Sequence, residues 1–143
     1  MKKIYTSLGF MSGTSGDGID VSIIKSDGYD YISKVINRYY PYKSISTNIK
    51  DELNTLKKII INSDDLTKYQ KRINYLEEQI TFAHNFAYQN IIKDLDFFRK
   101  NQEISHSQKD IIESDNLEEL KNIDINLIGF HGQTIFHDAK SKL

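Results

Sequence analysis

A glycine-rich segment near the start of the chain carries the residues best suited to bind a ligand. Four of the seven glycines lie between Ser7 and Asp20, in the sequence SLGFMSGTSGDGID. Glycine has no Cβ and adopts positive φ readily, so backbone N–H groups can approach an anion closely. Ser12, Thr14 and Ser15 add short hydroxyl donors. The segment is therefore a candidate cradle for phosphate oxygens.

Asp17 does not fit this cradle as a direct phosphate contact, because two anions repel each other. It would instead hold Mg²⁺ through a water molecule or accept hydrogen bonds from turn amides. The segment is neither a Walker loop nor a dinucleotide-binding fingerprint, since it lacks a Gly-Lys-Ser/Thr ending and a strand follows it. A hairpin in which Asp17 and Gly18 only form the turn fits the same residues, so composition alone leaves both interpretations open.

A second polar group, IGFHGQT, lies at residues 128–134, at the end of the last predicted strand. Ligands of open α/β sheets collect at the carboxyl ends of strands. His131, Gln133 and Thr134 offer donors and acceptors that suit a hydroxyl-rich ligand. A turn in which the backbone satisfies His131 is the structural alternative.

The other histidines give little support for a metal site. His137 follows His131 by six residues, and the chain has no cysteine, so these two histidines make a weak metal case. His84 borders the apolar face of a predicted helix and His106 lies in a polar segment, so we expect structural or solvent-exposed roles for both.

The elements around the glycine-rich segment read as strands. Residues 3–10 and 19–25 flank it, and residues 31–42 follow a Ser-Asp-Gly turn signal. Together they predict a three-stranded antiparallel meander. The single proline, Pro41, suits the end of the third strand or a sheet edge, because it donates no ladder hydrogen bond.

Helical spacing follows the meander. A first helix is predicted over residues 49–60, and Ser63-Asp64-Asp65 opens a longer one. The apolar face of the longer helix extends over about 33 residues. Its positions are Leu66, Tyr69, Ile73, Leu76, Ile80, Ala83, Ala87, Ile91, Leu95 and Phe98.

The polar residues 99–122 lack a sustained period, which predicts a loop or insertion. Residues 123–130 (IDINLIGF) predict a fourth strand, and a helical crossover implies that it lies parallel to a partner in the same sheet. The predicted fold is α/β: a mixed sheet with a three-stranded β-meander, a long crossover helix and a parallel strand. Helices cover one face of this sheet, and nothing in the sequence covers the other.

Bulk properties exclude some partners. The 143 residues suit one domain. A net charge of −1 gives no electrostatic reason to expect nucleic acid or an anionic membrane as a partner. No apolar run approaches the roughly 20 residues that cross a bilayer, and the first residues read as a strand rather than a signal peptide. We expect a cytoplasmic protein.

The two motifs together resemble one family. GFMSGTSGDGID resembles the opening G-(apolar)-M-S-G-T-S-x-D-G-x-D of the anhydro-N-acetylmuramic acid kinases, and IGFHGQTIFH resembles their second motif, G-x-H-G-Q-T-(apolar)-x-H. The resemblance covers essentially the whole chain. It implies a sugar kinase of the actin/Hsp70/hexokinase-like superfamily, with part of a ribonuclease H-like, actin-like ATPase domain.

The resemblance also implies the chemistry. Such a kinase uses ATP and Mg²⁺ to convert 1,6-anhydro-N-acetylmuramic acid to N-acetylmuramic acid 6-phosphate in cell-wall recycling, and water opens the anhydro ring. The implied ATP-phosphate contacts are Gly13, Thr14, Ser15, Gly16, Asp17, Gly18, Ile19 and Asp20, with Asp17 as a water-mediated Mg²⁺ contact. The implied sugar contacts are His131, Gly132, Gln133 and Thr134.

The resemblance implies limits too. Family members are longer, with two domains and a catalytic aspartate in a later segment, and the full-length family suggests a homodimer. We therefore expect residues 1–143 to be an incomplete, inactive N-terminal domain without a catalytic residue of its own. The alternatives are a non-enzymatic binding module and one half of a split kinase completed by a second chain.

Two positions depart from the family pattern. Gly16 stands where the family usually has a larger apolar residue, which we expect to loosen the loop. Phe130 replaces a small residue before His131, which we expect to crowd the cleft.

Overall fold

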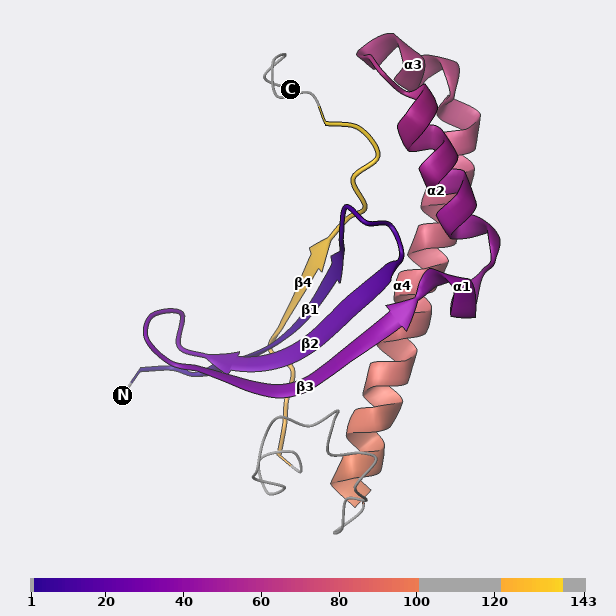
Figure 1. The fold of residues 1–143 in the computed structure, drawn as a ribbon. Helices are drawn as coiled ribbons and strands as arrows, with labels where there is room; N and C mark the ends of the chain where they lie inside the picture. Colours follow the sequence, from indigo (N-terminus) through magenta and orange to yellow (C-terminus); the bar gives the residue numbers. More distant parts are fainter. Residues whose placement is uncertain (1, 101–121, 138–143) are drawn as a thin grey trace.

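The computed structural model describes residues 2–100 and 122–137 (Figure 1). Its elements in chain order are β1 (Tyr5–Ser12), β2 (Gly18–Ser26), β3 (Ile32–Pro41), α1 (Tyr42–Ile45), α2 (Asn48–Ile59), α3 (Ser63–Lys68), α4 (Gln70–Lys100) and β4 (Leu127–His131). The predicted order of three strands, helices and a last strand is confirmed, with the short α1 as an addition.

The four strands form one mixed sheet in the order β3-β2-β1-β4. β1 pairs antiparallel with β2, β2 pairs antiparallel with β3, and β1 pairs parallel with β4. The meander and the parallel last strand are therefore confirmed. The register sets Gly9 beside Gly129 and Met11 beside His131. This pairing brings the carboxyl ends of β1 and β4, where the two sequence motifs lie, to the same edge of the sheet.

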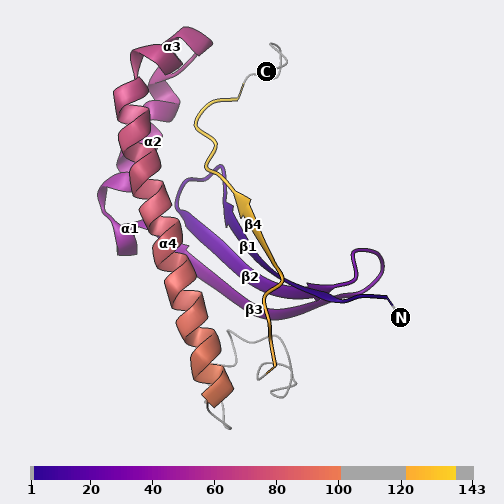
Figure 2. The same ribbon diagram turned by 180° about the vertical axis from the view of Figure 1, so that it is seen from behind.

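Alternation in the strands directs one set of side chains toward the helices, because successive residues of a strand point to opposite faces. Figures 1 and 2 both place α1, α2 and α4 on the same side of the sheet. The apolar stripe of α4 packs there, and burial of these side chains is the main stabilising contribution. The largest fully buried side chains are Tyr42, Leu8, Ile19, Ile23, Ile36, Ile49, Leu53, Leu56, Leu76, Ile91 and Leu95.

Two ion pairs fix α4 against its neighbours. Arg38 of β3 donates to Asp94 through both Nε and Nη2 at 2.8 Å. Arg72 near the start of α4 donates to both carboxylate oxygens of Glu52 on α2, at 2.7 and 2.9 Å. Such forked contacts set orientation as well as distance. They hold α2, which flanks the glycine-rich loop, in register with the long helix.

The predicted long helix is not continuous. It breaks at Tyr69, whose φ of −103° and ψ of 14° end α3. Asn62 and Asp65 form a reciprocal capping box that starts α3, and the turn at Tyr69 redirects the chain from α3 into α4. The prediction of one helix from Ser63 to Phe98 was wrong in this respect, although Leu66 and Tyr69 still pack partly against the core.

The last strand is shorter than predicted and starts at Leu127. Before it, the Asn126 side chain accepts the Thr6 N–H at 3.0 Å, and the Asn126 N–H donates to the Thr6 carbonyl at 2.9 Å. The Asn126 side-chain oxygen thus accepts the Thr6 N–H in place of a backbone carbonyl, and regular pairing of β4 with β1 begins only after this residue. Ile123 is buried in the core ahead of it. Most of the predicted polar loop lies outside the described residues.

β4 leaves an open edge and face in the described part of the chain. All five of its residues are exposed, and no described strand pairs with its outer edge. Leu127, Ile128 and Phe130 are each more than half exposed, at 52, 62 and 61%. Ile128 and Phe130 pair with Leu8 and Phe10 and therefore point to the helix side of the sheet. In Figures 1 and 2 no described element covers the opposite face, as expected.

Candidate functional site

The glycine-rich loop is a tight turn between β1 and β2. The Gly16 N–H donates to the Gly13 carbonyl at 3.2 Å, and Gly16 has a φ of +66°. This is the left-handed region, in which a Cβ is strained. A Cβ at position 16 would also lie 2.4 Å from Leu53 Cδ2 of α2. The bare Gly16 therefore lets α2 pack directly against the loop, in place of the loosening expected from the sequence.

Asp17 braces this turn. The Ser15 hydroxyl donates to Asp17 Oδ1 at 2.6 Å, and the Tyr42 N–H donates to the Asp17 carbonyl at 2.9 Å. The hydrogen bond from Ser15 lowers the pKa of Asp17 below its usual value, and the nearby charge of Lys50 acts in the same direction. Asp17 is thus an ionised carboxylate engaged with its own loop, which fits the turn-holding role considered from the sequence.

The tip of the loop offers hydrogen-bond donors. Thr14 and Ser15 are exposed. Their backbone N–H groups and the Thr14 hydroxyl meet no acceptor among the described residues. Consecutive N–H groups in a turn form a concave site that favours anions. The turn therefore presents the donor set that a phosphate group needs.

Gln133 joins the second motif to this loop. Its Nε2 donates to the Gly13 carbonyl at 2.8 Å, and the Tyr42 hydroxyl donates to its Oε1 at 3.3 Å. The same Nε2 lies 3.4 Å from the Thr134 carbonyl. The structure therefore brings the two motifs, predicted separately from the sequence, into direct contact.

Beneath the loop, His84 of α4 links the ends of β1 and β4. The Ser12 hydroxyl oxygen lies 3.2 Å from His84 Nε2 and donates to the His131 carbonyl at 3.1 Å. His84 Nδ1 lies 2.8 Å from the Ile80 carbonyl. A carbonyl only accepts, so Nδ1 carries the proton, and Nε2 of the neutral ring is an acceptor that competes with the His131 carbonyl for the single Ser12 hydroxyl proton. Ser12 and His84 are both buried.

Burial lowers the pKa of His84, although the hydrogen bond to the Ile80 carbonyl opposes this shift. The ring is flanked edge-to-face by Phe10 and Phe130, with centroids 6.3 and 4.5 Å away. Sequence reasoning assigned His84 a structural or solvent role and missed its contact with Ser12. The only sign of this contact in the sequence was a histidine between Ala83 and Ala87, two residues of the apolar face of the predicted helix.

Other predicted site residues lie elsewhere. Asp20 and His131 flank Met11 on adjacent strands of the helix-free face. There they line a shallow hollow whose floor is the paired Gly9 and Gly129. The predicted contacts thus divide into a loop group and an open-face group. The two remaining predicted residues of the first motif, Gly18 and Ile19, are both buried, and the Ile19 side chain lies in the core, so it does not face a ligand.

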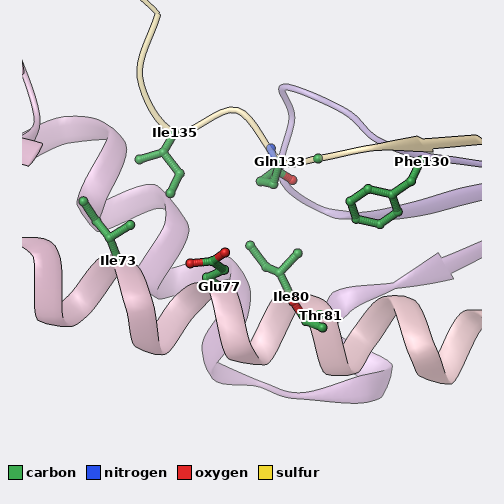
Figure 3. Close-up of a pocket in the computed structure, with 8 residues that line it drawn as sticks. Ile73, Glu77, Ile80, Thr81, Phe130, Gln133 and Ile135 are labelled. Carbon is green, nitrogen blue, oxygen red and sulfur yellow. The ribbon is translucent and has the colours of Figure 1, made fainter.

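A further pocket of about 280 Å³ lies between α4 and the chain after β4 (Figure 3). Figure 3 shows Ile73, Glu77 and Ile80 projecting from α4 toward the second motif. Phe130 forms part of its wall. The lining residues are Ile73, Glu77, Ile80, Thr81, Phe130, Gly132, Gln133 and Ile135. Its apolar walls and single carboxylate suit a small ligand with apolar faces and hydrogen-bond donors.

The described part of the chain shows neither a metal-ligand cluster nor a membrane-spanning helix. No group of three or more His, Cys, Asp or Glu side chains within residues 2–100 and 122–137 is placed to hold a metal ion. None of the helices in that part of the chain is long and apolar enough to cross a membrane.

Comparison with known proteins gives one consistent result. No protein-family model matches the chain. It is 36% identical over its whole length to the anhydro-N-acetylmuramic acid kinase of Pelagibacter ubique. It is 30% identical over 98% of its length to that of Nitrobacter winogradskyi, and 29% identical over 96% to that of Rhodopseudomonas palustris.

The chain spans about 30% of the length of these relatives. The mixed sheet with its long helix is an α/β fold consistent with a ribonuclease H-like domain, as the resemblance implied. Over the portion that it spans, the chain belongs by sequence to the anhydro-N-acetylmuramic acid kinase family.

Proposed function

We propose that this chain supplies the ATP-phosphate site of an anhydro-N-acetylmuramic acid kinase. The contact between Gln133 and the Gly13 carbonyl carries the proposal, because it joins the family's two motifs into one structure. The unpaired donors of Thr14 and Ser15 lie at the exposed tip of that structure. Phosphate oxygens are the acceptors that such a turn suits best.

The proposed reaction transfers the γ-phosphoryl group of ATP to O6 of 1,6-anhydro-N-acetylmuramic acid while water opens the anhydro ring. In this reaction the loop N–H groups would orient the phosphates, and Gly16 would keep the turn tight. Orientation matters because phosphoryl transfer depends mainly on positioning and electrostatic stabilisation. Mg²⁺, when bound with ATP, neutralises phosphate charge.

The fit to Mg²⁺ is indirect. Kinase sites bind this ion through one or two carboxylates, waters and the phosphates themselves. Asp17 is ionised and lies in the loop, but Ser15 occupies one of its oxygens. Asp17 would therefore act on the ion through water, and Asp20, on the open face, is the other carboxylate of the motif.

The sugar would lie toward the second motif, with His131 to Thr134 as its contacts. As the family resemblance implies, we propose that the catalytic aspartate comes from outside these 143 residues. The loop tip is open to solvent, which screens charge interactions. Phosphate binding by the chain alone should therefore be weak, with a dissociation constant on the order of 1 mM.

Calorimetric titration of the purified chain tests this proposal. Mg-ATP and inorganic triphosphate should bind, and adenosine should not. Thr14→Ala should weaken binding of both phosphates, whereas Thr55→Ala on the exposed side of α2 serves as a matched control and should not. Equal binding of adenosine and ATP, or no binding of either phosphate compound, would contradict a phosphate site at this loop.

A second assay tests whether the chain lacks the catalytic base. The chain should form no N-acetylmuramic acid 6-phosphate from the anhydro sugar and ATP. Formation of that product by the 143-residue chain would show that the catalytic base lies within it and would overturn this part of the proposal.

A further inference from the structure

Lys57 of α2 reaches the glycine-rich loop. Its ammonium donates a hydrogen bond to the Thr14 carbonyl, 43 positions earlier in the chain. The side chain is half-buried, whereas the adjacent Lys58 is exposed. Nothing in the sequence pointed to Lys57, because the chain is rich in lysine and the residue lies far from both motifs.

The charge of Lys57 has no counter-ion in the described part of the chain. No carboxylate of residues 2–100 and 122–137 lies within ion-pair distance of it. Its one acceptor there is a neutral carbonyl. Partial burial of an unpaired charge is unfavourable, and burial accordingly lowers the pKa of Lys57. An anion at this position would remove that cost.

The ammonium and the donors of the loop tip belong to the same turn. Lys57 bonds the carbonyl of Thr14, whereas the Ser15 N–H of the same trans peptide points to the opposite side, and the N–H groups of Thr14 and Ser15 have no described acceptor. A cation on one side of the turn and free N–H groups, without an anion to span them, form an incomplete site. The chemical group that completes it is a multiply charged oxyanion.

Gly16 makes this approach of α2 feasible. A Cβ at position 16 would lie 3.3 Å from Lys57 Nζ and 2.4 Å from Leu53 Cδ2. A larger residue would force α2, and Lys57 with it, away from the turn. The glycine that departs from the family pattern is thus the residue that admits Lys57.

We propose that Lys57 is a phosphate-binding residue of this chain, whose ammonium pairs with an oxygen of the polyphosphate that the loop holds. The inference rests on the proposed phosphate site and adds to it a cationic group from α2. The competing structural role is a favourable charge at the C-terminal end of α2. Lys58 shares that role, since both lysines lie in the last turn.

The two lysines therefore form a matched pair of variants. Inorganic triphosphate is titrated into the wild-type chain, Lys57→Gln, Lys58→Gln and Lys57→Arg at two salt concentrations. Loss of a charge-assisted hydrogen bond should weaken binding by about tenfold in Lys57→Gln, and Lys57→Arg should retain most of the affinity. Lys58→Gln should stay within about twofold of wild type, because a screened, exposed charge contributes little.

A second readout separates binding from folding. In an NMR titration, the Thr14 and Ser15 amide signals should move on addition of triphosphate and respond less in Lys57→Gln, while the spectrum of the sheet stays unchanged. Equal affinities for Lys57→Gln and Lys58→Gln would overturn the role of Lys57 and leave the loop site intact. Absence of triphosphate binding to the wild-type chain would overturn the phosphate site itself, and the role of Lys57 with it.

Discussion

The side-chain amide of Gln133 and the carbonyl of Gly13 are hydrogen-bonded at 2.8 Å across 120 positions of the sequence. The parallel pairing of β1 and β4 makes this contact possible, because both motifs leave the sheet at the same edge. Gln133 also accepts from the Tyr42 hydroxyl. One side chain thus holds the loop to the segment after β4 and to the residue that follows β3.

Gln133→Glu should destabilise the protein. A carboxylate in place of the amide removes the donor and turns an oxygen toward the Gly13 carbonyl. Loss of a partly buried hydrogen bond that leaves an acceptor unpaired costs about 1 to 3 kcal/mol. Urea denaturation followed by circular dichroism measures the change. Gln89→Glu, at an exposed position of α4, is the control and should be close to neutral. Equal stability of the two variants would contradict a stabilising role for the hydrogen bond between Gln133 and the Gly13 carbonyl.

Gly16→Ala should destabilise more than Gly28→Ala. Both glycines have positive φ, 66° and 79°, so both variants carry the left-handed strain of about 1 to 2 kcal/mol. Only position 16 adds a contact, since a Cβ at Gly28 meets nothing within 4 Å whereas one at Gly16 meets Leu53. The difference in free energy of unfolding between the two variants therefore measures the crowding of α2.

A double mutant checks the cause. Leu53→Ala removes the clashing methyl groups but also opens a cavity, so it should be destabilising alone. Combined with Gly16→Ala, it should cost less than the sum of the two single changes, because neighbouring residues are not additive. Strict additivity would place the strain of Gly16→Ala in the backbone alone.

Much of the sheet was predictable because its pattern is local. Alternation in β1 and β2 places Leu8, Phe10 and Val21 on the helix side, and the structure buries them. The apolar face of α4 was equally predictable from its periodicity, and the break at Tyr69 was the exception. That break depends on the capping box of Asn62 and on the path from α2, and periodicity reports neither.

The site was only partly predictable, because it depends on contacts between distant elements. Gln133 was selected from its motif, but its partner Gly13 follows from the β1–β4 register. His84 and Lys57 carry no local signal. One fits an apolar stripe and the other a lysine-rich composition, and only packing reveals that each contacts the glycine-rich region.

The exposed side chains of β4 should make the isolated chain bind hydrophobic dye. Leu127, Ile128 and Phe130 lie along an edge strand whose outer side is unpaired among the described residues. Such edges favour association with other chains. Ile128→Lys should reduce dye fluorescence and light scattering. Ile61→Lys, at a position that is 75% exposed outside the sheet, is the control and should change both signals less. Equal effects of the two variants, or a dye-free wild type, would contradict an exposed apolar edge.

Stability should fall as the pH drops below about 6.5, through His84. Burial lowers the pKa of His84 in the folded state from its usual 6.5. Above that pH the ring is neutral in both folded and unfolded chains and its contribution is complete. Below it the unfolded chain takes up a proton that the folded chain resists, so unfolding is favoured until the lower folded pKa is reached.

His84→Gln should flatten this part of the pH profile, measured as urea midpoints between pH 7.5 and 5. Glutamine keeps a polar end near Ser12 but does not titrate, so the variant should lose stability at pH 7.5 and then change less on acidification. His137→Gln, at an exposed position, should follow the wild-type profile. A wild-type slope that persists in His84→Gln would assign the pH dependence to other groups, and with it the conclusion that a neutral His84 joins β1, α4 and β4 beneath the loop would lose its support.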